Sequence, residues 1–258
     1  MSSTDTQRLR LTIALSARWD AYPLRFHQLA AHGFALEYTP SPDALEALPT
    51  HVGAFVEAGI PVRYHAFFPE HEFGHRDVDI AEASLRLQMA LLEAMQGLGE
   101  QVVTVHIGLL PATPLDLGRA QANLARLAER SRELGITLCL ENLRRGPTSD
   151  PKTVHTWAQQ ADTMITLDVG HAISCQAVRR GERSVKDYIA TFSERLFEVH
   201  MYEREEDRHY PPKDMTILGP VIERLLQTRC SWWTLELPAL DEALATRALL
   251  LAYMEGKR

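Results

Sequence analysis

The chain has 258 residues, of which 45% are hydrophobic and 24% are charged, so it can bury one sizeable core and we expect a single domain, residues 1–258. Its net charge of -7 argues against a protein that coats nucleic acid through surplus lysine and arginine. No run reaches the roughly 18 apolar residues of a membrane span, and Cys139, Cys175 and Cys230 are too scattered for a disulfide framework, which predicts a cytoplasmic protein.

Short apolar runs alternate along the chain with longer segments of helical period. The expected strands are residues 9–15, 34–38, 60–66, 101–107, 135–141, 163–168, 195–201 and 231–237. The expected helices are residues 24–32, 43–57, 77–97, 117–134, 151–160, 184–192, 217–228 and 240–256. Each parallel connection needs a crossover helix and closure removes the sheet edges, so this alternation predicts an α/β fold, the (β/α)8 TIM barrel. The alternative, an open doubly wound sheet, needs a glycine-rich turn after its first strand, and residues 16–23 (SARWDAYP) are not one.

Acidic and histidine side chains recur at or just beyond the ends of these strands. They are His65, His106, Glu141, Asp168, His171, His200 and Glu236, with Asp207 and His209 following in one loop. The carboxyl ends of barrel strands converge on one pocket. Carboxylates and imidazoles without thiolates suit a divalent ion such as Mn, Zn, Co, Fe or Mg. The sequence therefore predicts a metal site at this end of the barrel.

The two-residue period of a strand also predicts which other side chains face the barrel interior. By this parity Arg63 and Glu198 point inward together with His65 and His200. Because a buried charge needs a partner, we expect Arg63 to pair with Glu198 or Glu37 inside the barrel.

Several short motifs together resemble the xylose isomerase-like TIM barrel superfamily, which includes ketose 3-epimerases and endonuclease IV-type nucleases. They are YHAFF (64–68), VHIG (105–108), CLENL (139–143), LDVGHA (167–172), VHMYE (199–203), DRH (207–209) and LELP (235–238). The combination of ENL, LDVGHA and a late LELP is specific, whereas each piece alone is weak. The resemblance extends from the third expected strand to the eighth.

The epimerase branch of this resemblance implies a sugar or polyol isomerase or epimerase with one divalent ion. Glu141, Asp168, His200 and Glu236 would hold the ion, and the two glutamates would transfer a proton on opposite faces of a substrate carbon next to a chelated carbonyl. His171 would bind a substrate hydroxyl. The aromatic residues expected to pack on the sugar are Trp19, Phe67 and Phe68.

The endonuclease IV branch implies instead a phosphodiesterase that acts on abasic DNA with up to three ions. All nine side chains would then be ligands: His65 and His106 join Glu141 at one ion, and His171, Asp207 and His209 form another group. The two histidines depart from the epimerase pattern, and residue 206 is Glu where an epimerase would carry Arg.

Acidic residues expected at the pocket mouth, Glu70, Glu72 and the segment EREED (203–207), would repel a DNA backbone. The sequence therefore favours a small sugar or polyol as substrate over nucleic acid, with no membrane partner. The resemblance also makes a homodimer plausible. A substrate phosphate could be held by arginines of two loops, namely Arg144, Arg145, Arg179, Arg180 and Arg183.

Overall fold

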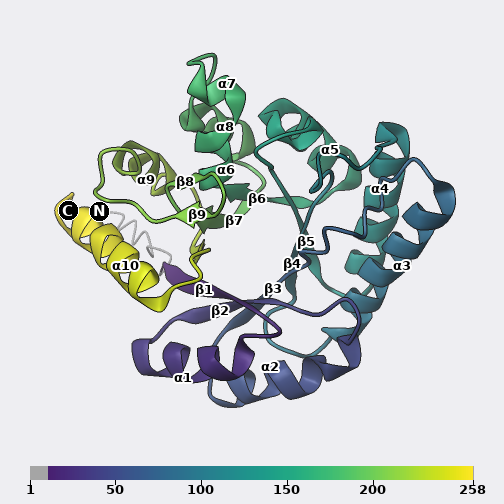
Figure 1. Ribbon diagram of the computed structural model, residues 1–258, viewed down its shortest axis with the longest axis horizontal. Helices are drawn as coiled ribbons and strands as arrows, with labels where there is room; N and C mark the ends of the chain where they lie inside the picture. Colours follow the sequence, from purple (N-terminus) through teal and green to yellow (C-terminus); the bar gives the residue numbers. More distant parts are fainter. Residues whose placement is uncertain (1–10, 258) are drawn as a thin grey trace, which may run out of the picture.

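Eight parallel strands close into a barrel surrounded by helices in the computed structural model, which describes residues 11–257 (Figure 1). Around the barrel the strands follow the order β1-β10-β7-β6-β5-β4-β3-β2. Their bounds are β1 Thr12–Arg18, β2 Ala35–Thr39, β3 Val62–His65, β4 Val102–Val105, β5 Thr137–Glu141, β6 Met164–Asp168, β7 Leu196–Met201 and β10 Trp232–Leu235. The predicted (β/α)8 barrel is confirmed.

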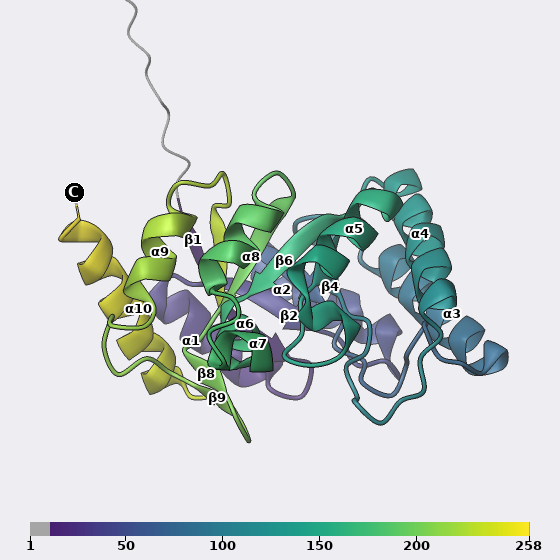
Figure 2. The same ribbon diagram turned by 90° about the horizontal axis from the view of Figure 1, so that it is seen from above.

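Helices cover the outside of the barrel and link its strands (Figures 1 and 2). The longer helices are α1 Tyr22–His32, α2 Leu48–Glu57, α3 Val78–Ala94, α4 Leu117–Glu133, α5 Pro151–Ala161, α8 Val185–Phe192, α9 Gly219–Leu225 and α10 Leu240–Glu255. Short 3-10 turns, η1 (Leu45–Ala47) and η2 (Pro147–Ser149), precede α2 and α5. Over residues 11–257, no helix combines the length and apolar character that a membrane crossing requires.

Two features between β6 and α9 were not predicted from the sequence. Two short helices, α6 (Val169–Ser174) and α7 (Gln176–Arg179), follow β6, and a two-stranded hairpin of β8 (Arg204–Glu205) and β9 (His209–Tyr210) follows β7. These elements have two to six residues, too few to show a periodic pattern. The first strand also begins later than the expected residues 9–15; residues 9 and 10 lie outside the described part of the chain.

The barrel interior below the carboxyl ends of the strands is partly polar, as the two-residue period of the strands predicts. The Thr104 and Thr166 hydroxyls are 2.7 Å apart, and the Thr234 hydroxyl donates to Glu198 at 3.0 Å. All four side chains are buried. These hydrogen bonds satisfy buried polar groups directly under the strand ends, and so fix the strands that carry the site.

Arg63 is buried in this lower layer and pairs with Glu198, which confirms one of its two expected partners. Its Nη1 lies 3.5 Å from a Glu198 oxygen, and its Nε lies 2.7 Å from Glu100, a partner that parity did not predict because Glu100 precedes β4. The guanidinium also lies over the Trp232 ring. Burial raises the pKa of Glu198 to about 8, and the charge of Glu37 adds to this rise although Arg63 opposes it.

Candidate metal centre

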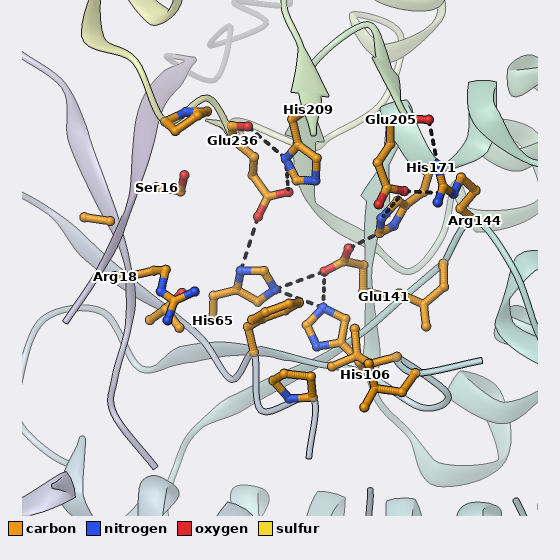
Figure 3. A pocket seen from close by; sticks show the side chains of 18 of the residues that line it. Ser16, Arg18, His65, His106, Glu141, Arg144, His171, Glu205, His209 and Glu236 are labelled. Carbon is orange, nitrogen blue, oxygen red and sulfur yellow. Dashed lines mark hydrogen bonds and ion pairs between the residues drawn. The ribbon is translucent and has the colours of Figure 1, made fainter. Parts of the chain in front are cut away.

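The carboxyl ends of the barrel strands bring six of the predicted ligands together in a buried cluster, four of which Figure 3 shows, His65, His106, Glu141 and Glu236. Three of them are the last residues of their strands, namely His65, Glu141 and Asp168. His200 lies within β7, and His106 and Glu236 each follow the last residue of a strand, β4 and β10. Because parallel strands of a closed barrel end at the same rim, residues far apart in sequence become neighbours here.

His65, His106 and Glu141 form the tightest group of possible metal ligands. The two Nε2 atoms are 2.9 Å apart, and one Glu141 oxygen lies 2.9 Å from His106 Nε2 and 3.4 Å from His65 Nε2. Burial lowers the pKa of His106, although the charge of Glu141 opposes this shift, and so favours the neutral ring. These are hydrogen-bond distances, and with both Nε2 atoms unprotonated the same three groups would face one cation position. The donor types are those that Zn and similar ions prefer.

His200 is oriented for a ligand role by a carboxylate that the sequence analysis did not assign to the site. Its Nε2 hydrogen-bonds to Glu37 at 2.7 Å, and both side chains are fully buried. Its Nδ1 lies 3.3 Å from Glu141 and 3.5 Å from Glu236, yet it has no hydrogen-bond partner among residues 11–257. A carboxylate on one ring nitrogen with the other nitrogen free is the usual surrounding of a metal-binding histidine.

Asp168 is the remaining member of the expected inner group of Glu141, Asp168, His200 and Glu236, and its ligand atoms lie close to those of Glu141 and His171. It ends β6 and caps α6, accepting the His171 N–H at 2.6 Å, while its other oxygen accepts the Tyr202 hydroxyl at 2.9 Å. Burial raises the pKa of Asp168 to about 7, and the charges of Glu141 and Glu236 raise it against the opposing His171. Crowded carboxylates of this kind bind a divalent cation more readily than they remain charged side by side.

A second group lies above the inner one and consists of His171, Glu205 and His209. Each histidine places Nδ1 on a backbone carbonyl, His171 on Asn142 at 3.0 Å and His209 on Glu236 at 2.9 Å. Because a carbonyl oxygen can only accept, Nδ1 carries a proton, and Nε2 is the nitrogen of each ring that a cation could bind. His171 Nε2 faces a Glu205 oxygen at 3.3 Å, so this group too has its lone pairs turned toward a cation position.

The raised pKa values of two histidines also support a cation site in this cluster. Burial alone lowers the pKa of His65, but the surrounding carboxylates Glu37, Glu141 and Glu236 raise it to about 10. His171 behaves alike: burial lowers its pKa, yet Asp168 and Glu205 raise it to about 10. The rings of His65 and His171 therefore lie in a strongly negative field, which also favours the binding of a metal cation.

Glu205 occupies the position expected of Asp207. In the β8–β9 hairpin Glu205 lies directly opposite His209, and opposite residues of an antiparallel pair bring their side chains together. Asp207 lies at the turn between the two strands, where its exposed carboxylate accepts the Tyr210 hydroxyl at 2.8 Å. Among the described residues it belongs to none of the ligand groups. The tight hairpin explains this, and only a recognised turn in REEDRHY (204–210) would have indicated it.

The three aromatic residues expected to contact substrate lie in different surroundings. Phe67 lines the cavity above the cluster and is 39% exposed. Trp19 is equally exposed but does not line the cavity. Phe68 is 2% exposed and belongs to the hydrophobic core, because the chain turns sharply after His65 and directs consecutive side chains to opposite sides. The expected substrate contact of Phe68 is therefore corrected.

A cavity of about 570 Å³ opens above the cluster, a size suited to a small-molecule ligand or one unit of a larger one. Its walls include apolar residues of the loop after β4, Leu109 to Pro111. Four arginines also line it: Arg18, Arg25, Arg144 and Arg145. Arg144 Nε lies 3.2 Å from Glu205 (Figure 3).

The acidic mouth expected from the sequence is weaker than the composition of these loops indicates. Glu72 is buried, where its oxygens accept the N–H groups of Gly74 at 2.7 Å and Gly108 at 2.6 Å. Glu203 is buried as well. Glu205 is paired with Arg144. Glu70, Glu206 and Asp207 stay exposed, so three of the six expected acidic side chains still oppose a phosphate-bearing substrate and three do not.

The family model of the xylose isomerase-like TIM barrel matches residues 25–253. The chain belongs to this family. An uncharacterised protein of Methanocaldococcus jannaschii, MJ0008, is 31% identical over 161 residues, which are 62% of this chain and 70% of that protein.

Solved structures of the same barrel include enzymes of two kinds. A 3-keto-D-glucoside 4-epimerase from E. coli is 17% identical with a TM-score of 0.73, covering 95% of this chain and 100% of that one. Endonuclease IV from Thermus thermophilus is also 17% identical, with a TM-score of 0.66 and coverage of 95% and 99%. At these identities the likeness shows the fold, and the chemistry has to be argued from the site.

Proposed function

We propose that this member of the xylose isomerase-like TIM barrel family is a metal-dependent hydrolase of phosphodiesters that holds more than one divalent ion. The observation that carries the proposal is the arrangement of the outer histidines. His65 and His106 converge with Glu141 on one side of the cluster, and His171 and His209 converge with Glu205 on the other. A single-ion isomerase needs neither pair.

The residues fit such ions by donor type and by their unpaired atoms. The first ion would be held by His65, His106 and Glu141, and the second by the inner group that both branches of the family require, namely Glu141, Asp168, His200 and Glu236. The third would be held by His171, Glu205 and His209. One such unpaired atom is His200 Nδ1, which is buried without a hydrogen-bond partner among the described residues and faces Glu141 and Glu236. Bound ions would supply a water nucleophile at neutral pH and neutralise charge on the phosphate oxygens.

Residues around the ligands hold them in the required state. Glu37 accepts from His200 Nε2 and so keeps Nδ1 free, and the carbonyl of Asn142 does the same for His171 Nε2. The guanidinium group of Arg18, which lines the cavity, would contact the phosphate oxygens of a substrate. Phe67 and the apolar wall would exclude water from the remaining space.

A sugar or polyol isomerase is the second candidate, and the position of His65 between two glutamates favours it. His65 Nε2 lies 3.4 Å from Glu141, and its Nδ1 lies 3.3 Å from Glu236. The two carboxylates thus contact the two nitrogens of one ring, and both border the cavity in which a substrate carbon would lie for a proton transfer. In this function one carboxylate would remove the proton and the other would return it.

The two functions differ in what the outer histidines contribute, and this difference defines the test. The protein loaded with Zn or Mn is assayed on an abasic DNA duplex and on bis(p-nitrophenyl) phosphate. We expect hydrolysis that falls by about 100-fold or more in His106→Gln and stays unchanged in His27→Gln, a control at an exposed helical residue. No hydrolysis of either compound, together with solvent deuterium incorporation into a ketose, would replace this proposal by the isomerase.

A further inference from the structure

A second cavity, of about 850 Å³, adjoins the metal centre and has an unusual charge. It is bounded by the loop after β5 and by α6, α7 and the loop that follows them. Five arginines line it: Arg144, Arg145, Arg179, Arg180 and Arg183. Among the described residues that line it, only two carboxylates oppose them, Asp150 and Glu182, although the chain as a whole has a net charge of -7.

Three of these guanidinium groups are available to a ligand. Arg144 is held by Glu205 and Arg183 by Asp150. Arg145 and Arg179 have no acidic partner within 4.0 Å among residues 11–257. Arg180 approaches Glu182 only at 3.8 Å, and both side chains are about 60% exposed, so that solvent weakens the pair. Unpaired guanidinium groups around one cavity form a site for an anion with several oxygens.

The two cavities share part of their lining. Arg144 and Arg145 line both of them, and Arg144 contacts Glu205, which belongs to the outer ligand group. The loop after β5 therefore carries arginines that border both the cavity above the candidate metal centre and the second cavity. Gly146, which follows Arg145, has a φ of 77°, and this left-handed turn directs the chain between the two cavities.

We propose that this arginine cavity binds a second phosphate group of the substrate, next to the group that reacts at the metal centre. The inference rests on the proposed function only in assigning the phosphate to the substrate, because phosphate binding itself needs no turnover. The chemistry is that of a phosphate ester, carried either by a small sugar phosphate or by a neighbouring nucleotide of a strand. Planar guanidinium groups bind phosphate oxygens in pairs, which suits both sources.

The test measures equilibrium binding of labelled inorganic phosphate to the metal-loaded protein. The variant is Arg179→Gln/Arg180→Gln, because both residues line only the second cavity. The control removes the same charge at two exposed arginines elsewhere, Arg86→Gln/Arg229→Gln. We expect the variant to weaken phosphate binding by about tenfold or more, or to abolish one binding site, and the control to bind as the original protein does.

Displacement of the label identifies the source of the phosphate. Displacement by ribose 5-phosphate supports a small substrate, and displacement only by octadeoxythymidylate supports a strand. If the variant and the original protein bind phosphate with the same affinity and stoichiometry, the arginine cavity is not a phosphate site and the inference fails. A protein that binds phosphate at these arginines but hydrolyses no phosphodiester contradicts the proposed function and leaves the site intact.

Discussion

Replacing Glu205 by glutamine should remove one ion from the metal centre. The substitution keeps the size of the side chain but removes the charge that lies 3.3 Å from His171 Nε2 and 3.2 Å from Arg144 Nε. Loss of a residue that only supports a metal ligand costs about 10- to 100-fold in metal affinity. Glu205 is proposed as a direct ligand, so we expect the upper end or more, about 100-fold, which equals ~2.7 kcal/mol.

The hairpin itself offers a matched control. Asp207→Asn removes the same charge two residues away, but this carboxylate is exposed and bonded to Tyr210. Zn titration followed by calorimetry, with ion counts after desalting, should show one ion fewer in Glu205→Gln and no change in Asp207→Asn. The reasoning is refuted if Asp207→Asn loses the ion while Glu205→Gln keeps it, as the sequence pattern alone would predict.

Three further outcomes follow from the structure. Glu37→Gln should lower metal affinity by about tenfold, because the buried carboxylate that orients His200 loses its charge; calorimetry measures this. Gly170→Ala should lower the free energy of unfolding in urea by about 1–3 kcal/mol, because the added methyl group would overlap the buried Tyr202 ring. Iodoacetamide at pH 8 should leave the folded protein unlabelled: burial raises the pKa of the Cys230 thiol to about 12, and the other cysteines, Cys139 and Cys175, are also buried and free.

Each of these three predictions has a control variant or a result that would contradict it. Glu57→Gln removes an exposed carboxylate at the end of α2 and should leave metal affinity unchanged. Gly53→Ala, within the same helix and with no atom near the added methyl group, should raise stability by about 0.5–1 kcal/mol. If Gly170→Ala is as stable as Gly53→Ala, the packing described around Tyr202 is wrong. Rapid labelling of the cysteines without unfolding would contradict their burial.

The barrel and its inner ligands could be predicted because they depend on strong periodic patterns. Side chains alternate along a strand between the barrel interior and its outside. A strand that ends in His65 or Glu141 therefore places that side chain at the rim of the barrel, whichever loop follows. The pairing of Arg63 with Glu198 followed from the same parity and from the need of a buried charge for a partner.

The role of Glu205 in the outer part of the site could not be predicted because it depends on short local structure. The β8–β9 hairpin has two residues in each strand, and its register makes Glu205, and not Asp207, the neighbour of His209. Spacing along the chain gives no information on such a register. Glu37 was also missed as a supporting residue of His200, because the contact joins strands that are far apart in sequence.

The negative charge at the cavity mouth could not be predicted from the sequence either, because it depends on which acidic side chains are buried. Glu72 counts as a negative residue in the sequence, yet it lies inside a loop and caps two backbone N–H groups. Net charge of a segment therefore overstated the negative field at the cavity mouth, since a charge acts on an approaching ligand mainly when it is exposed.

The number of bound ions tests the central claim most directly. The protein is saturated with Zn or Mn, desalted, and its metal content is measured by plasma mass spectrometry against protein concentration. The three ligand groups around Glu141, His200 and Glu205 predict two or three ions per chain. One ion per chain would contradict the multinuclear centre, and the outer histidines would then be contacts for a polar substrate.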